Sequence, residues 1–239
     1  MDNIDILKNG INQIGMQISD EKINKFVKYK DLILEWNQKI NLTAIEDEKE
    51  IYIKHFIDSV SSITKGYIKD EISIIDVGTG AGFPGIPLRI CFENINLTLL
   101  DSLNKRINFL EEVCSQNNLT NVKFIHGRAE DFGQDPDFRE KYDVATARAV
   151  AGLPVLLEYC TPFIKVGGYF VCLKGPNANA ELEESKNAMD VLGVEFIEKI
   201  DINLPYTELK HNILVLQKVK KTPEKYPRKA GKPSKSPIK

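Results

Sequence analysis

The sequence predicts an α/β fold: a mostly parallel, seven-stranded sheet with an antiparallel last strand, preceded by an N-terminal helical extension. From residue 72 onward, short β-branched runs alternate with helical segments, which is typical of βαβ units. The last two runs are joined by a link too short for a helical crossover, so we expect that pair to be antiparallel. Residues 1–65 lack proline and carry apolar side chains at helical spacing, which predicts helices.

An N-terminal helical cap is expected over residues 1–65. Ser19 is suited to be a helix N-cap, because its hydroxyl can accept a hydrogen bond from the first turn. Asp20 and Glu21 then place negative charge at the positive end of the helix dipole. A second helix is predicted over residues 48–64. The block carries no motif for chemistry of its own, so we expect it to cover the domain that follows.

That following domain is expected to span residues 66–218. Its predicted strands are the seven β-branched or apolar runs, 72–77, 97–101, 122–125, 142–146, 168–173, 194–197 and 213–216. Its predicted helices lie between most of these strands, at about 84–92, 103–118, 152–164 and 178–191.

The composition is that of a globular protein, with 42% hydrophobic and 28% charged residues in a chain of 239. No run is long and apolar enough to span a bilayer, and the N-terminus lacks the pattern of a signal peptide, so a cytoplasmic location is expected. The four cysteines lie far apart without a Cys-x-x-Cys pair, which argues against a zinc site and against a disulfide framework.

Charge is distributed unevenly along the chain. Residues 218–239 carry nine Lys or Arg and one Glu, a net charge of +8, whereas the remainder carries 23 basic and 33 acidic residues, a net charge of −10. The apolar pattern stops after Lys218, so residues 219–239 are expected to form an extended, flexible basic tail. Such a tail either contacts a polyanion or serves only solubility. If it binds RNA, deleting it raises the KM for RNA and leaves cofactor affinity intact.

The strongest local signal is a glycine-rich turn, Asp76-Val77-Gly78-Thr79-Gly80-Ala81-Gly82, between a predicted strand and a predicted helix. Glycines permit the sharp turn and let a ligand approach the backbone closely. The Gly-Lys-Ser/Thr of a phosphate-binding P-loop is absent. A dinucleotide stays possible, but the carboxylate of Asp76 favours S-adenosylmethionine, whose ammonium and sulfonium are positive. Asp101 follows the second strand and is expected to bind ribose hydroxyls.

Six ordered motifs over about residues 20–218 resemble the glucose-inhibited division protein B family, bacterial methyltransferases of small-subunit ribosomal RNA. They are the glycine turn continued by Phe83-Pro84-Gly85-Ile86-Pro87, Trp36-Asn37-x-x-x-Asn41-Leu42-Thr43-Ala44, His55-Phe56-Ile57-Asp58-Ser59, Gly127-Arg128-Ala129-Glu130, Thr146-Ala147-Arg148-Ala149-Val150-Ala151 and Leu173-Lys174-Gly175.

This resemblance implies a Rossmann-like class I methyltransferase fold and methyl transfer to N7 of a guanine in the 530 loop of 16S rRNA (position 527 in the usual rRNA numbering). The implied partner is 16S rRNA or a small ribosomal subunit particle; we expect no metal, no membrane partner and a monomer. Carried over by motif, the contacts to S-adenosylmethionine are Gly78, Phe83, Asp101, Ser102, Leu103, Ala129, Glu130 and Arg148. To these the glycine turn adds Asp76, Gly80 and Gly82.

Methyl transfer to guanine N7 is an in-line displacement that needs no general base, because N7 already has a free lone pair. The sequence after the fourth strand, Thr146-Ala147-Arg148-Ala149, lacks the Asn/Asp-Pro-Pro-aromatic motif of amino-group methyltransferases and has no cysteine nucleophile. A cation that orients the base is useful instead. The candidates are Arg148, then Arg128 and Lys174, each of which has a structural ion-pairing role as its alternative.

Two further hypotheses belong to other classes of protein. One is an RNA-binding assembly factor with a vestigial cofactor pocket. The other is a nicotinamide-dependent oxidoreductase. His55 is expected to pair with Asp58 rather than to act as a base, and no histidine has the spacing of a metal ligand.

Overall fold

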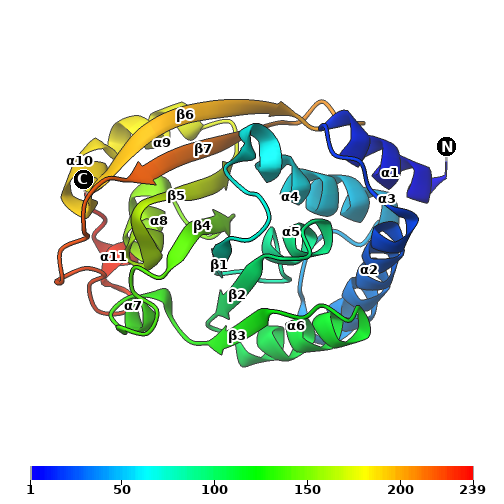
Figure 1. Cartoon of the computed structure of the whole chain (residues 1–239), viewed down its shortest axis with the longest axis horizontal. Helices are drawn as coiled ribbons and strands as arrows, with labels where there is room; N and C mark the ends of the chain where they lie inside the picture. The colour runs from blue at the N-terminus through cyan, green and yellow to red at the C-terminus, as the bar shows by residue number, and fades with distance from the viewer. Residues whose placement is uncertain (1, 239) are drawn as a thin grey trace.

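Seven strands form one sheet in the order β3-β2-β1-β4-β5-β7-β6, in a computed structural model that describes residues 2–238 (Figure 1). β7 runs antiparallel to both of its neighbours, and the other pairings are parallel. The strands are β1 (Ser73–Val77), β2 (Asn96–Asp101), β3 (Val122–His126), β4 (Tyr142–Arg148), β5 (Ile164–Lys174), β6 (Val194–Asn203) and β7 (Lys210–Lys218). The predicted sheet and its antiparallel last strand are confirmed.

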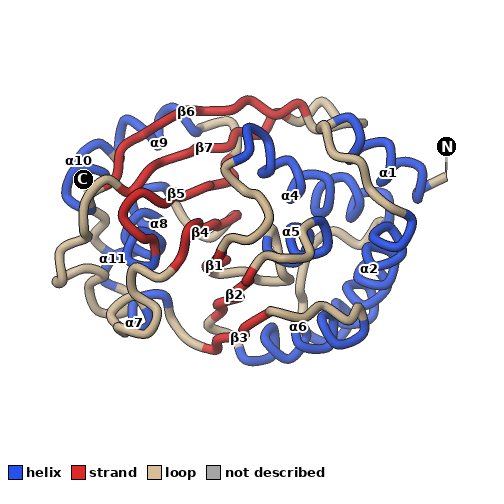
Figure 2. The backbone as a smooth tube through the Cα atoms, in the orientation of Figure 1, coloured by secondary structure: helices blue, strands red, loops and turns tan. Residues whose placement is uncertain are grey.

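Helices cover both faces of the sheet (Figure 2). On one face lie the N-terminal helices and the first two crossover helices, which are α1 (Asn3–Gln13), α2 (Asp20–Ile40), α3 (Glu48–Ile51), α4 (Asp58–Val60), α5 (Gly85–Cys91) and α6 (Asn104–Gln116). On the other face lie α7 (Ala129–Phe132), α8 (Leu153–Cys160), α9 (Ala178–Glu184), α10 (Lys186–Leu192) and α11 (Lys232–Lys235). No helix among residues 2–238 is long and apolar enough to cross a membrane.

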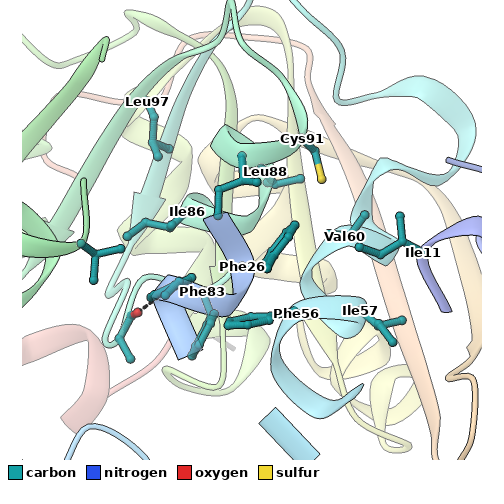
Figure 3. Close-up of a cluster of buried hydrophobic side chains, with 14 of the residues drawn as sticks. Ile11, Phe26, Phe56, Ile57, Val60, Phe83, Ile86, Leu88, Cys91 and Leu97 are labelled. Carbon is teal, nitrogen blue, oxygen red and sulfur yellow. Dashed lines mark hydrogen bonds between the residues drawn. The ribbon is translucent and has the colours of Figure 1, made fainter. Parts of the chain in front are cut away.

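Successive side chains of a strand point to opposite faces of the sheet, so the buried side chains form two cores, one on each face. Ile74 packs with the N-terminal helices, α5 and α6, whereas its neighbour Ile75 packs with α8 and α10. This follows from the two-residue side-chain period of a strand. Figure 3 shows Phe26, Phe56 and Phe83 together in the first core, so the N-terminal helices share a core with the sheet.

The predicted N-terminal helices are present, with one difference. Ser19 caps α2, because its side chain accepts a hydrogen bond from the backbone of Lys22. The expected helix 48–64 is instead divided into α3, a π-helical turn (Tyr52–Ile57), α4 and a 3₁₀ segment (Ser61–Gly66). Hydroxyl groups in this stretch donate to carbonyls three or four residues earlier, and such bonds compete with regular α-helical geometry.

The order of the strands indicates at which edge of the sheet a ligand would bind. The chain crosses from β1 outward to β2 and β3, and then returns to β4 on the other side of β1. In open α/β sheets, ligands bind beyond the carboxyl ends of the strands at such a reversal. At this edge Gly78 directly follows β1, while Asp101 and Arg148 are the last residues of β2 and β4.

The C-terminal segment differs from the expected extended tail, because it packs against α7 and α8 (Figure 1). The Arg139 guanidinium donates to the carbonyls of Thr222, Pro223 and Tyr226. Arg228 forms an ion pair of 2.6 Å with the fully buried Glu158. Ion pairs and backbone hydrogen bonds therefore hold the segment in place, together with Tyr226 and Ile238, which pack against the second core.

Candidate active site

The glycine-rich turn after β1 takes backbone conformations that require glycine. Gly78 and Gly80 have φ angles of 70° and 62°, in the left-handed region. The backbone N–H groups of Gly78 and Thr79 donate to the carbonyl of Leu100 on β2, which joins the turn to its neighbouring strand. From the N-terminal side, the Tyr29 hydroxyl donates to the carbonyl of Ala81. The helical extension thus helps to fix the shape of the turn.

Asp76 lies beneath this turn and organises it. Its Oδ2 atom accepts hydrogen bonds from the Thr79 hydroxyl at 2.7 Å and from the Gly85 N–H at 2.9 Å. Burial raises the pKa of this carboxyl group to about 6, against the effect of those two bonds. Its other oxygen, Oδ1, is buried without a partner among the described residues. Asp76 therefore keeps one acceptor atom available below the turn.

Asp101 closes the turn from the end of β2. One carboxylate oxygen accepts from the Gly80 N–H and the other from the Leu103 N–H, both at 2.9 Å. The Nη1 atom of Arg106 lies 3.4 Å from the same carboxylate. Asp101 is 3% exposed, yet it lines a cavity. These contacts fix the carboxylate at the cavity wall.

That cavity, here called the glycine-turn cavity, has a volume of about 250 Å³. It lies beyond the ends of β1, β2 and β3, and α8 and the C-terminal segment complete its wall. Its lining residues are Val77, Gly78, Leu100, Asp101, Ser102, Gly127, Arg128, Ala129, Glu130, Val150, Tyr159, Gly231 and Ser234. A Cβ atom at Gly78 would lie 2.8 Å from Cγ2 of Val150, so only glycine fits at this point of the wall.

A second cavity, here called the arginine cavity, lies beyond the ends of β4, β5 and the start of β7 and has a volume of about 390 Å³. Its lining residues are Ile45, Lys54, His55, Asp58, Arg148, Ala149, Leu173, Lys174, Gly175, Leu209 and His211. Arg148 and Ala149 line this cavity while the next residue, Val150, lines the glycine-turn cavity. The two cavities therefore adjoin across a segment of three consecutive residues.

Arg148 is held in place from several sides. Its Nη1 atom donates to the carbonyl of Lys54 at 3.0 Å and to Oδ2 of Asp58 at 2.8 Å, and its Nη2 atom donates to Nδ1 of His55 at 3.0 Å. The guanidinium also lies 4.7 Å from the centre of the Phe83 ring. A guanidinium has five N–H groups, and these bonds use three of them, so two N–H groups have no partner among residues 2–238.

The histidines on either side of Arg148 have different roles. Because Arg148 can only donate, Nδ1 of His55 accepts, and its Nε2–H donates to the Thr43 hydroxyl at 2.8 Å. His211 places Nδ1 2.6 Å from Oδ1 of Asp58. The expected pair of His55 with Asp58 is therefore wrong: Asp58 pairs with His211 and Arg148. Burial alone would raise the pKa of Asp58, but those two partners hold it below its usual value.

The two histidines give opposite pH dependences of stability. The hydrogen bond to Asp58 raises the pKa of His211 above 6.5, so its contribution is complete below about pH 6.5 and is lost as the pH rises through the folded-state value. Burial lowers the pKa of His55 to about 3, so its contribution is present above pH 6.5 and is lost as the pH falls.

We expect His211→Gln to destabilise the protein most below about pH 6.5, because there the parent carries the charged pair with Asp58. The difference in free energy of unfolding between parent and variant should shrink steadily at higher pH. Urea denaturation at a series of pH values from about 5 to about 9 measures it. His126→Gln, outside this network, is the matched control. A difference for His211→Gln that is independent of pH would contradict the expectation.

The predicted site residues divide between the two cavities. Gly78, Asp101, Ser102, Ala129 and Glu130 line the glycine-turn cavity together, as does Arg128. Arg148 and Lys174 line the arginine cavity. Asp76, Gly80, Gly82, Phe83 and Leu103 line neither cavity; Gly80 and Gly82 belong to the turn itself, and Asp76 lies beneath it.

Three of these placements have clear physical reasons. Phe83 is 6% exposed and stacks on His55 with ring centres 4.5 Å apart, so it supports the arginine cavity from within the core. Lys174 forms an ion pair of 2.6 Å with Glu181 and donates to the carbonyl of Ala151. Arg128 precedes α7 and so lies at the other cavity from the one that holds Arg148.

Sequence reasoning missed several residues of the glycine-turn cavity. Val77, Leu100 and Gly127 flank predicted positions, and strand-end placement alone would have found them. Val150, Tyr159, Gly231 and Ser234 come from later segments whose fold had to be known first. All four cysteines are buried, and no cluster of His, Cys, Asp or Glu in residues 2–238 is arranged to hold a metal ion.

A sheet of this order, with a glycine turn after β1 and a carboxylate after β2, defines the Rossmann-like class I methyltransferase fold. Solved structures of this fold are similar: TrmN from Thermus thermophilus (TM-score 0.52, 16% identity, 70% of this chain and 53% of that chain) and M. jannaschii TYW2 in complex with AdoMet (0.50, 18%, 63% and 70%).

Sequence comparison narrows the class to a family. The family model of GidB, rRNA small subunit methyltransferase G, matches residues 22–203. Ribosomal RNA small subunit methyltransferase G of Alkaliphilus oremlandii (strain OhILAs) is 60% identical over 98% of both chains. That of Clostridium perfringens (strain 13 / Type A) is 48% identical over 100% of both. The chain belongs to the rRNA small subunit methyltransferase G family, as its motifs predicted.

Proposed function

We propose that this protein transfers a methyl group from S-adenosylmethionine to N7 of a guanine in the 530 loop of 16S rRNA, by in-line displacement without a general base. The observation that carries the proposal is the pair of adjoining cavities, one built on the glycine turn and the other around Arg148. Consecutive residues of the β4 end line the two, so a donor in one cavity and an acceptor in the other lie close together.

The glycine-turn cavity suits S-adenosylmethionine in the chemistry of its lining residues. Its wall at Gly78 has no room for a Cβ atom, and the carboxylate of Asp101 offers acceptors for ribose hydroxyls. The buried, unpartnered Oδ1 of Asp76 favours a positive group near the turn over a phosphate. Ala129 and Glu130 provide a small wall and an acceptor at the end of β3. When bound, this cofactor supplies an electrophilic methyl group on a sulfonium.

The arginine cavity suits an acceptor that needs no deprotonation. Its lining includes Lys54, Arg148 and His211. Asp58 is engaged by its two partners, and the acceptor nitrogen of His55 by Arg148. The hydrogen bond to Asp58 raises the pKa of His211 and so favours its protonated form, which cannot accept a proton. The two unpaired N–H groups of Arg148 can donate to guanine O6 and orient the ring, which leaves N7 free. Guanine N7 is deep in the major groove of A-form RNA, so the target must be unstacked or in a loop.

Two measurements test the proposal together. Equilibrium dialysis with labelled S-adenosylmethionine should detect binding by the parent and a large loss in Asp101→Ala. Mass spectrometry of 16S rRNA from a strain lacking the protein should show the loss of one N7-methylguanosine, which the parent gene restores and the Asp101→Ala gene does not. Binding without any lost modification would refute the rRNA substrate. A parent that binds nicotinamide dinucleotide instead would refute the cofactor assignment.

A further inference from the structure

The C-terminal segment contributes directly to the glycine-turn cavity, since Gly231 and Ser234 are among its lining residues. We propose that residues 226–235 form a wall of the S-adenosylmethionine pocket, where the hydroxyl groups of Tyr159 and Ser234 bind the adenosine end of the cofactor. The inference rests on the proposed function, because it takes the glycine-turn cavity as the cofactor site. It assigns to the basic tail a role in cofactor binding that its charge alone does not suggest.

The segment is anchored on the domain at one firm point before it reaches the cavity. Glu158 on α8 is fully buried, and both of its carboxylate oxygens accept from the Arg228 guanidinium, at 2.6 to 3.1 Å. The backbone N–H of Arg228 donates to the same carboxylate at 2.8 Å. Because a buried carboxylate without a partner is costly, this contact commits the chain to lie along α8.

Three residues further on, the segment reaches Glu130. The backbone N–H of Gly231 donates to Oε1 of Glu130 at 2.8 Å. Gly231 has a φ angle of 79°, and no atom lies within 4 Å of the position its Cβ would take, so the turn rather than crowding calls for glycine. Glu130 is 6% exposed and lines the cavity beside Ala129. The tail thereby fixes the carboxylate of Glu130 on α7, the helix that follows β3.

A pair of hydroxyl groups lies beside this carboxylate. Oη of Tyr159 and Oγ of Ser234 are 2.8 Å apart, and Tyr159 and Glu130 line the same cavity. Each hydroxyl can donate and accept. Two hydroxyls next to a carboxylate match the ring nitrogens and amino group of a purine, while Asp101, in the same cavity, offers its acceptors to the ribose. By contrast, Lys229, Lys232 and Lys235 are not among the residues that line the cavity.

Isothermal titration calorimetry with S-adenosylmethionine tests the wall. Ser234→Ala and Tyr159→Phe should each weaken binding by roughly three- to tenfold, the effect of one hydrogen bond, and the double variant by at least as much. Lys235→Ala, the exposed neighbour on α11, is the matched control and should bind like the parent. An affinity of the double variant within about threefold of the parent would overturn the inference.

Limited trypsinolysis tests whether the cofactor and the segment contact each other. Trypsin cleaves after Lys229 and Lys235, and saturating S-adenosylhomocysteine should slow both cleavages by roughly tenfold or more. Asp101→Ala should lose this protection. One outcome would disprove the wall but leave the cofactor site in place. In that outcome Asp101→Ala abolishes binding, Ser234→Ala and Tyr159→Phe bind like the parent, and the cofactor does not change the rate at which trypsin cleaves the tail. If the parent itself binds no S-adenosylmethionine, both ideas fail.

Discussion

Replacing Arg228 by methionine is expected to lower the free energy of unfolding by about 3–5 kcal/mol. Glu158 is 0% exposed and takes three hydrogen bonds from the Arg228 side chain. Methionine fills a similar volume without the charge, so the variant keeps a buried carboxylate whose remaining partner among residues 2–238 is one backbone N–H. Urea denaturation followed by circular dichroism measures the loss, and Lys229→Met, at an exposed neighbour, should change stability by less than about 0.5 kcal/mol.

A loss of stability in Arg228→Met could come from the unpaired carboxylate or from the lost packing of the guanidinium, and the double variant Glu158→Leu/Arg228→Met separates these two causes. If the unpaired carboxylate causes it, removing both charges should recover most of the stability. A double variant as unstable as Arg228→Met would show instead that the guanidinium matters through its packing. A stability of Arg228→Met within about 1 kcal/mol of the parent would mean that the segment does not rest on this ion pair.

The tail shows where sequence reasoning reaches its limit. Its composition, basic and rich in proline, is that of a disordered segment, because no apolar stripe marks a packed face. It is held in part by single contacts with residues distant in sequence, such as Arg228 with Glu158, 70 residues away, and Gly231 with Glu130, 101 residues away. Such pairings have no local signature. The proposed wall predicts, in contrast to the expectation from the sequence, that deleting the tail weakens cofactor binding, because Gly231 and Ser234 line the glycine-turn cavity.

The sheet and the glycine turn, by contrast, were predictable because their signals are local. Each strand is a β-branched or apolar run, and each glycine of the turn lies where the backbone needs a positive φ. The direction in which a side chain points was harder to predict than the element on which it lies. Asp76 stands before the turn, as its sequence place requires, but Thr79 and Gly85 draw its carboxylate beneath the turn. Likewise, the pairing of Asp58 with His211 depends on β7 lying next to β5, which no spacing within residues 48–64 reveals.

Arg148→Lys is expected to lower kcat for RNA methylation about 100-fold, with the affinity for S-adenosylmethionine unchanged within about twofold. Lysine keeps a positive charge beside Asp58, so the carboxylate retains a partner. Lysine lacks the planar guanidinium, which bonds Lys54, Asp58 and His55 and still has N–H groups left to donate to the guanine. Single-turnover methylation and calorimetry measure the two quantities, and Arg128→Lys, at the other cavity, should leave kcat within about threefold.

Asp58→Asn distinguishes the positioning of Arg148 from its contact with the base. The amide introduced at this position would keep an oxygen for the guanidinium but lose the charge that holds it, so kcat should fall less than in Arg148→Lys. The pH dependence of kcat should also change, because the pKa of His211 then loses the carboxylate that raises it. If Arg148→Lys retained full kcat while Asp58→Asn did not, Arg148 would be a support for the cavity wall, and another group would have to orient the guanine.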